Sequence, residues 1–445
     1  MKHATPAFAA LCAVLVAATP SLAASRPPAH IDSYGTKAPY TPEQNPASYS
    51  KAPAGFVPVF TENVSRHGSR AATDSEDGDL VLALWDKAST EGQLTRKGEE
   101  FGPKVRALLA AMAKVGYGNL SGRGREEMRD TADRMAARVP SLFAGIAAKG
   151  EKIDVVSSGQ GRAIDSANEY AGELAAKDPA LKPLIGATRT DKDLLYFHKA
   201  AGGKAYQDYL ANDQRLASTL KSITDQPKTH QAAESVLRKI FKRPFVDGLP
   251  AEDRVAAAEA VYNLYAIAPA MIKESPGGRG WGLDRYISRT DAAWFGYLGD
   301  AEDFYEKGPG FSDSDITYKM ANVLLDDFFK QVKAKQSGTS ALGAELRFTH
   351  AEEIIPLAAL MGLPESTKPA TPGVSYTYKN NPWRGADVSP LGANIQWDVY
   401  QKGTRYLVRM LYNEKEIPFK AACKPVARNS AFYDFTELER CFGRG

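Results

Sequence analysis

The chain has 445 residues, of which 43% are hydrophobic and 24% charged, and its formal net charge at pH 7 is +3. This composition is typical of a globular protein with roughly two or three core-bearing units. The charge is too mild to indicate a nucleic-acid-binding protein, and the sequence has no dense lysine–arginine block. We therefore expect no nucleic-acid partner.

Residues 1–24 have the three parts of a secretory signal peptide. They are a positive start at Lys2, an apolar core over residues 7–18, and small residues up to Ala24. As a helix that core would span about 18 Å, against roughly 30 Å of bilayer hydrocarbon. No later stretch of the sequence is long enough to cross a membrane. We expect cleavage near Ala23 or Ala24, no membrane span, and export to the periplasm or out of the cell.

The cysteines agree with export. Cys12 lies in the leader, so its removal leaves Cys423 and Cys441, an even number in an oxidising compartment. We expect one disulfide between them, worth about 3 kcal/mol in the chain-entropy model. The alternative is a pair of reduced, buried thiols, and the spacing fits neither a metal site nor a redox motif.

Strand and helix patterns alternate after an irregular start. Residues 25–54 are rich in Pro, Ser, Tyr and Lys and predict an extended arm over the surface. Within residues 55–190, strands are predicted over 56–64 and 153–157 and helices over 97–115, 125–139 and 163–177. This order predicts an α/β fold with a mostly parallel central sheet flanked by helices.

Residues 191–310 have little strand signal and predict an inserted all-helical domain. Its helical patterns cover 206–223, 230–241, 251–273 and 290–306. Residues 311–445 return to the α/β domain. They predict a long helix over 316–335, a strand over 346–349, a helix over 352–361 interrupted by Pro356, and a hairpin of 395–400 with 406–412.

A short polar segment, Arg66-His67-Gly68-Ser69-Arg70, follows the first strand. A neutral imidazole is a competent nucleophile toward phosphorus, but a phosphate dianion repels it. Two guanidinium groups within one turn can bind the non-bridging oxygens and align the phosphorus for attack. Gly68 would let the backbone pass close to the phosphate. The alternative is a solvated basic turn, but the position at a strand end favours a functional site.

This segment resembles the RHGxR signature of the histidine phosphatase superfamily, specifically its acid phosphatase–phytase branch. Proteins of that branch commonly read RHGxRxP, and this chain has Ala72 at the last position. The resemblance implies the histidine phosphatase fold. It also implies that His67 becomes phosphorylated while Arg66 and Arg70 bind the phosphate.

A second segment, Phe348-Thr349-His350-Ala351-Glu352, ends the strand pattern over 346–349. Its His-Ala-Glu resembles the multiple inositol polyphosphate phosphatase group, which implies Glu352 as the proton donor and His350 as a phosphate ligand. A donor is needed because an alcohol is a poor leaving group. As a carboxylate, the same group can activate water to hydrolyse the phosphohistidine. Glu353 is the local rival, expected instead to be a first-turn helix carboxylate.

Further segments resemble the same group over about residues 57–441. Arg162, within 157–167, matches another phosphate-binding arginine, and residues 118–128, 296–310 and 413–419 match segments that we expect to be structural. The resemblance implies hydrolysis of inositol polyphosphates, phytate foremost. The substrate is then a small anion, no metal or cofactor is needed because arginines supply the charge, and no obligate protein partner is implied. Arginines lower and bound phosphate raises the pKa of Glu352, so we expect an acidic to neutral optimum.

Two other functions remain open. A broad acid or sugar-phosphate phosphatase would share the scaffold and take its specificity from the inserted domain, with Lys199, Lys204 and Arg289 as candidate contacts. A periplasmic binding protein for phosphate esters would keep the arginines and lose the nucleophile or the donor, yet both are present. The other histidines have no zinc-ligand spacing, and we expect His198 to pack or to cap a helix.

Overall fold

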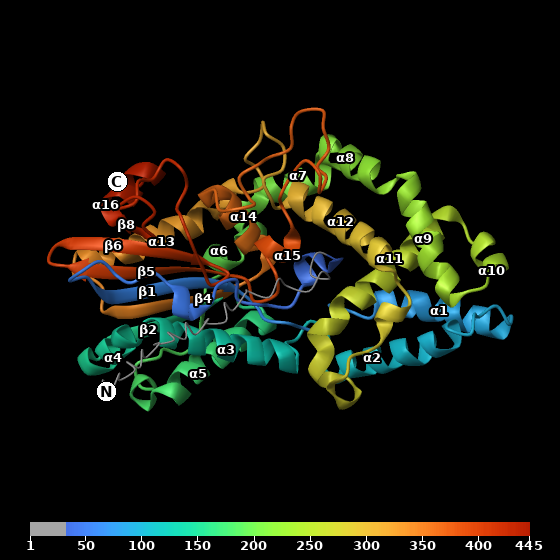
Figure 1. Cartoon of the computed structure of the whole chain (residues 1–445), viewed down its shortest axis with the longest axis horizontal. Coiled ribbons are helices and arrows are strands. Elements are labelled where there is room, and N and C mark those ends of the chain that lie inside the picture. The colour runs from blue at the N-terminus through green and yellow to red at the C-terminus, as the bar shows by residue number, and fades with distance from the viewer. Residues whose placement is uncertain (1–32) are drawn as a thin grey trace, which may run out of the picture.

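The computed structural model describes residues 33–445, and the predicted signal peptide with its cleavage site lies outside them. Its centre is a sheet of eight strands in the order β3-β2-β4-β1-β5-β6-β7, with β8 paired to β6 (Figure 1). The strands are β1 (Val57–Arg66), β2 (Lys152–Ser157), β3 (Arg189–Thr190), β4 (Leu342–Thr349), β5 (Asn394–Lys402), β6 (Arg405–Tyr412), β7 (Lys415–Ile417) and β8 (Phe432–Asp434).

The sheet is mixed, and β1 lies where its two halves meet. On one side β1, β4, β2 and β3 run parallel, and on the other β5, β6, β7 and β8 pair antiparallel. The α/β class is therefore confirmed, and the predicted hairpin is β5 with β6. The sheet is mixed and not mostly parallel, because the chain after β5 returns through hairpins without helical crossovers. The parallel register places Arg66 opposite Thr349. The first polar segment and the second thus leave the sheet at the same edge.

Helices cover both faces of the sheet (Figure 1). On one face, Leu346 and Phe348 of β4 pack in a core with side chains of three helices: α3 (Gly122–Arg138), α4 (Pro140–Lys149) and α5 (Gly161–Lys177). On the other, Trp397 of β5 packs against Phe328 and Phe329 of α13 (Asn322–Gln336). Also on that face are α14 (Ala351–Met361) and α16 (Phe435–Phe442).

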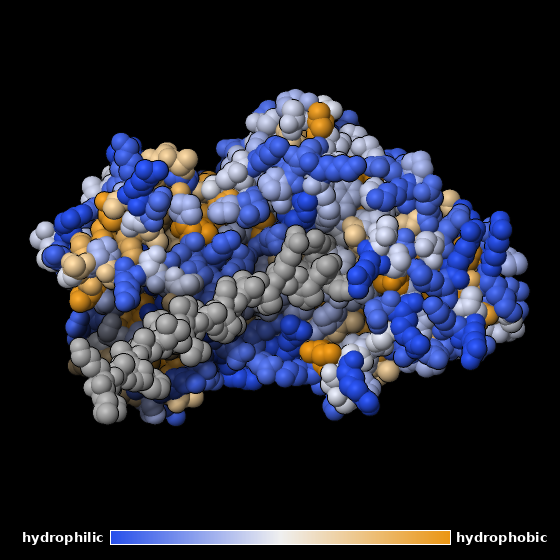
Figure 2. All heavy atoms as spheres, in the orientation of Figure 1, coloured by the Kyte–Doolittle hydropathy of each residue, from blue (hydrophilic) through white to orange (hydrophobic). Residues whose placement is uncertain are grey.

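The remaining long helices form the other end of the molecule, where Figure 2 shows a largely hydrophilic surface around α9 and α10. They are α1 (Glu76–Thr90), α2 (Phe101–Val115), α7 (Lys204–Asn212), α8 (Gln214–Thr224), α9 (Pro227–Ile240), α11 (Ala251–Ile267) and α12 (Arg289–Glu306). Three short helices are α6 (Lys192–Leu195), α10 (Arg243–Asp247) and α15 (Gly385–Val388). Because α1 packs on α11, this end combines early and late parts of the chain. The division into domains stays a prediction.

Three local predictions differ from the structure. The helix expected over 206–223 is two helices, because Asp213 caps α8 by accepting a hydrogen bond from the Leu216 backbone. Helix α14 continues through Pro356, whose missing N–H removes a single helical hydrogen bond. Residues 33–40 do not lie over the surface, since Gly35, Ala38 and Tyr40 are buried.

One described segment, Ala251–Glu274, is long and apolar enough to cross a membrane by those two criteria alone. It comprises α11 and a following 3-10 helix, and 61% of its most apolar window is buried inside the molecule. Such burial is the ordinary situation of a core helix.

At the other end of the fold, the predicted disulfide joins Cys423 to Cys441 of α16, with their Cα atoms 5.2 Å apart.

Candidate active site

The predicted site residues gather at the carboxyl edge of three parallel strands. His67 follows β1, His350 follows β4, and Arg162 lies in the first turn of α5, just after β2. The rings of His67 and His350 are 5.4 Å apart between centroids. The fold thus brings two short motifs together that are far apart in the sequence.

His67 is held as a neutral imidazole with one free nitrogen. Its Nδ1 lies 2.9 Å from the carbonyl oxygen of Gly68, which can only accept, so Nδ1 carries the proton. The ring is 2% exposed. Burial first, and then Arg66 and His350, hold its pKa well below the usual range. The lone pair of Nε2 is therefore available for attack on phosphorus.

Gly68 is required by a contact with α3. A Cβ there would come within 2.5 Å of the carbonyl oxygen of Gly124, and one on Gly124 would come within 2.0 Å of the Ser69 carbonyl oxygen. Glu127 of α3 then holds the loop by accepting hydrogen bonds from the backbone N–H and the hydroxyl of Ser69, at 2.8 and 2.9 Å. The loop that carries His67 is thus fixed from behind by helix α3.

Three arginines surround the site with donors that the protein leaves unused. The Nε atoms of Arg66, Arg70 and Arg162 are buried and have no hydrogen-bond partner among the described residues. The other edge of Arg66 is held, because Nη1 donates to the carbonyls of Thr36 and Ser389 at 2.6 and 2.5 Å. Burial lowers the pKa of Arg66 and of Arg70 to about 10, which leaves both charged at neutral pH. Unpaired buried cations of this kind predict an anion in the site.

His350 adds a neutral donor. Its Nε2 lies 2.7 Å from the Ser158 hydroxyl oxygen. That oxygen accepts a hydrogen bond from the backbone N–H of Gln160, so the hydroxyl proton can be donated to Nε2. Nδ1 then carries the ring proton, and it is buried without a partner among the described residues. Burial and the charge of Arg162 lower the pKa of His350 to about 3. Such an N–H can bind a phosphate oxygen.

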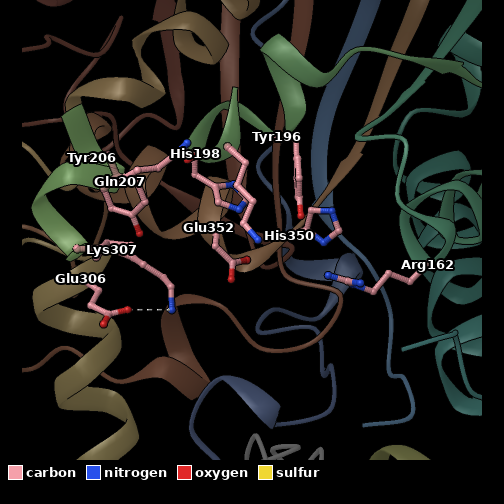
Figure 3. A pocket seen from close by; sticks show the side chains of 11 residues that line it. Arg162, Tyr196, His198, Tyr206, Gln207, Glu306, Lys307, His350 and Glu352 are labelled. Atoms are coloured by element: carbon pink, nitrogen blue, oxygen red, sulfur yellow. Dashed lines mark hydrogen bonds and ion pairs between the residues drawn. The ribbon is translucent and has the colours of Figure 1, made fainter. Parts of the chain in front are cut away.

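The two neighbouring carboxyl groups of α14 have different surroundings. Glu352 lines the open pocket, and in Figure 3 its carboxyl lies between Lys307 on the left and Arg162 on the right. Burial alone would raise its pKa, but Lys307, His198 and His350 together hold it at about 2. Glu353 is fully buried, turned to His198 and Thr349, and does not line the pocket. The geometry therefore supports Glu352 as the donor candidate.

The pocket beside these groups has a volume of about 550 Å³. Its lining is Arg162, Tyr196, His198, Lys199, Tyr206, Gln207, Leu210, Glu306, Lys307, His350 and Glu352 (Figure 3). Of the three guessed specificity contacts, Lys199 lies here and Arg289 and Lys204 do not. Lys204 instead pairs with Asp208 at the surface.

Lys307 was missed as a pocket residue. It lies in the segment 296–310, whose match to the family was interpreted as structural, and its Nζ is 2.5 Å from Asp303 of α12. Also unexpected is His198, whose Nδ1 lies 2.5 Å from Glu353. The pair of His198 with Glu353 joins residues 155 positions apart, so no local pattern predicts it. The pair of Lys307 with Asp303 is local, four residues apart, but it does not indicate that Lys307 lines the pocket. Residues 33–445 contain no group of three His, Cys, Asp or Glu side chains that could hold a metal ion.

Comparison with known proteins gives consistent matches. A family model described as the histidine phosphatase superfamily (branch 2) matches residues 60–413. The multiple inositol polyphosphate phosphatase of Bifidobacterium longum, in a crystal structure with inositol hexasulfate, is 33% identical with a TM-score of 0.86, covering 92% of this chain and 97% of that one. In complex with phosphate, the same protein gives 32% identity, the same two coverages and a TM-score of 0.87. Multiple inositol polyphosphate phosphatase 1 of Gallus gallus is 25% identical, over 92% of this chain and 93% of that protein.

Proposed function

This chain belongs to the histidine phosphatase superfamily (branch 2), and on that premise we propose that it hydrolyses inositol polyphosphates, phytate foremost, one phosphate at a time. The observation that carries the proposal is the set of unused arginine donors around a neutral, buried His67. The relatives named above support the substrate class. The 550 Å³ pocket next to the donors offers room for a ring that carries several phosphates.

In the proposed first step, the Nε2 lone pair of His67 attacks phosphorus. The P–N bond forms as the bond from phosphorus to the bridging oxygen breaks, and Glu352 gives its proton to that oxygen. Guanidinium and imidazole N–H groups bind the non-bridging oxygens, where charge is held through the transition state. The Nδ1–H of His67 stays on the Gly68 carbonyl, which steadies the ring while Nε2 bears the phosphoryl group.

In the second step, water attacks the phosphohistidine. Glu352, now a carboxylate, accepts a proton from that water, the P–N bond breaks, and inorganic phosphate leaves. His67 returns to its neutral form with the lone pair on Nε2. Glu352 thus ends the cycle protonated, as it began.

The proton on Glu352 limits the pH range. In the free site its pKa is about 2, so the acid form is scarce at neutral pH. A bound phosphate brings negative charge toward Lys307 and Arg162 and raises the pKa of the nearby carboxyl. Activity then falls as pH rises through the pKa of Glu352 in the complex, which supports an acidic to neutral optimum. Export, as the leader predicts, fits the disulfide between Cys423 and Cys441.

The test is phosphate release from phytate and from a simple aryl phosphate, with chelator present and His67→Ala as the inactive reference. Turnover of phytate that resists the chelator, together with a phosphoryl group on His67 in protein quenched at alkaline pH, is the expected result. Activity confined to the aryl ester would refute the substrate and keep the mechanism. Binding of inositol hexasulfate without turnover of either ester would identify a binding protein instead.

A further inference from the structure

A buried carboxyl–imidazole pair forms part of the pocket wall. Nδ1 of His198 lies 2.5 Å from Oε1 of Glu353, whose other oxygen lies 2.9 Å from the Thr349 hydroxyl. Glu353 is 0% exposed and His198 is 7% exposed. A fully buried carboxyl group is costly unless it is paired. The pair therefore fixes the His198 ring in one orientation.

The fixed ring presents its other nitrogen to the pocket. Within residues 33–445, the only ring nitrogen of His198 with a hydrogen-bond partner is Nδ1. The ring packs edge-on against Tyr196, at 4.5 Å between centroids, and His198 is one of the pocket-lining residues in Figure 3. Nε2 is thus the polar atom that this side chain can offer to a ligand.

The surroundings favour a proton on that nitrogen. Burial raises the pKa of Glu353 to about 7, so the pair retains a proton in the acidic range. With this proton between Oε1 and Nδ1, the ring's own proton sits on Nε2. A phosphate near Nε2 would accept a hydrogen bond from this N–H.

We infer that His198 binds a second phosphate of the substrate, one that the reaction leaves in place, through its Nε2–H, and that Glu353 is the positioning residue that holds the ring. The inference rests on the proposed function, since only a polyphosphate has such a group. His198 is close enough to Glu352 and His350 to alter the pKa of both, so it lies within reach of a ligand on the phosphate site. Lys307, directly after α12, provides a cation in the same pocket.

A histidine that only packs would need neither the buried carboxyl partner nor a nitrogen open to the pocket. Two substitutions separate these roles. His198→Asn keeps an amide near the Nδ1 position for Glu353 and removes Nε2, whereas His198→Gln can place an amide N–H near the Nε2 position. His230→Asn is the matched control, because His230 on α9 is exposed and pairs with Asp225 at 3.6 Å.

We expect His198→Asn to raise the KM for phytate about tenfold, the loss of one charge-assisted hydrogen bond, with kcat within about twofold of wild type. Its kinetics on an aryl phosphate should stay within about twofold of wild type when each protein is assayed at its own pH optimum for both substrates, because His198 also contributes to the pKa of Glu352. His198→Gln should recover part of the phytate KM, and Glu353→Gln should raise it with no effect on the aryl ester. The Kd for inositol hexasulfate, by calorimetry, should rise with the KM, while the Kd for inorganic phosphate stays constant.

An unchanged Kd for inositol hexasulfate in His198→Asn, or equal losses on both esters, would overturn the inference. The aryl phosphate rate and the thermal unfolding midpoint report folding in each variant. Should His198→Asn fail to fold, His198→Gln and Glu353→Gln still decide, because the inference requires a raised Kd for Glu353→Gln and a smaller rise for His198→Gln, which can keep an N–H near the Nε2 position. Failure of the proposed function is distinct, since wild-type protein would then leave phytate intact.

Discussion

The active site has two walls, the sheet edge and the helices that line the neighbouring pocket, and they differ in how their charges are balanced. On the wall formed by the sheet edge, the Nε donors of three arginines are buried and have no hydrogen-bond partner within residues 33–445. On the wall formed by helices, Lys307 is already paired with Asp303 and His198 with Glu353, each at 2.5 Å. The first wall is incomplete without an anion, and the second is stable without one.

This difference suggests a division of labour. The arginine N–H donors that have no partner in the free protein can bind the transferring phosphate of any ester. Changes at the sheet edge should therefore affect every substrate alike. A group on the helical wall that is already paired has only its remaining N–H donors to offer to a ligand. We expect these donors to bind phosphates other than the one transferred, so changes on the helical wall should mainly affect substrates that carry additional phosphates. Each prediction below tests one side of this comparison, beginning with the largest effect.

His67→Ala should lower kcat on phytate and on an aryl phosphate alike, by at least about a thousandfold, because the nucleophile of the sheet-edge wall is lost. Rates of phosphate release measure this. The same variant should still bind inositol hexasulfate, since the arginines remain. His230→Ala is the control, because this partly exposed histidine does not line the pocket. Residual turnover within tenfold of wild type would remove His67 from the mechanism.

Glu352→Gln should reduce kcat on phytate by about 10²- to 10⁴-fold, the usual contribution of a general acid. The loss at the first step should be smaller for an aryl phosphate, whose leaving group needs less protonation. Water activation would then limit the rate, and phosphohistidine should accumulate in rapid-quench samples. Glu353→Gln, the neighbouring residue, should leave the aryl ester rate near wild type. Equal losses in the two variants would show that the carboxyl groups do not have separate roles.

The sequence supported prediction of one wall far better than the other. Arg66, His67 and Arg70 lie within one turn, and His350 and Glu352 within another, so each set is local in the chain. Parallel pairing of β1 with β4 brings the sets together. The alternating order of strands and helices in the sequence predicts such parallel pairing. The role of the buried N-terminal residues was not predicted, because composition gives no sign that the Thr36 carbonyl holds Arg66.

The helical wall depends on contacts between distant elements. His198 and Glu353 are 155 residues apart, and neither has a neighbour in sequence that indicates a pair. Lys307 lies at the end of α12, where a lysine is ordinary for helix-dipole reasons. Its proximity to Glu352 follows from tertiary packing alone. Specificity residues of this kind carry no local signal, whereas the transfer machinery does.

Lys307→Met should raise the pKa of Glu352, because Lys307 is the strongest of the charges that hold it at about 2. The donor would then stay protonated to higher pH, and the alkaline limb of the pH–rate profile should move upward by roughly one unit. An aryl phosphate is the proper substrate for this measurement. With phytate, the variant would also lack a cation that can bind the other phosphates, and that loss would obscure the shift in the pH profile. Lys239→Met, which breaks a similar pair with Asp291, is the control. A limb that stays fixed or moves downward would contradict the assignment.

The smallest effect on activity is expected where neither wall is touched. Replacement of both Cys423 and Cys441 by Ser opens a link across 18 residues between the segment before β8 and helix α16. Unfolding free energy should fall by about 3 kcal/mol, because the unfolded chain regains the freedom of that loop. The guanidinium midpoint measures this loss, and reduced wild-type protein should match the variant. Rates on both esters should stay within about twofold of wild type, since neither cysteine lines the pocket. A selective loss on phytate would instead mean that the helical wall depends on the far end of the sheet, and the two walls could then no longer be treated as separate.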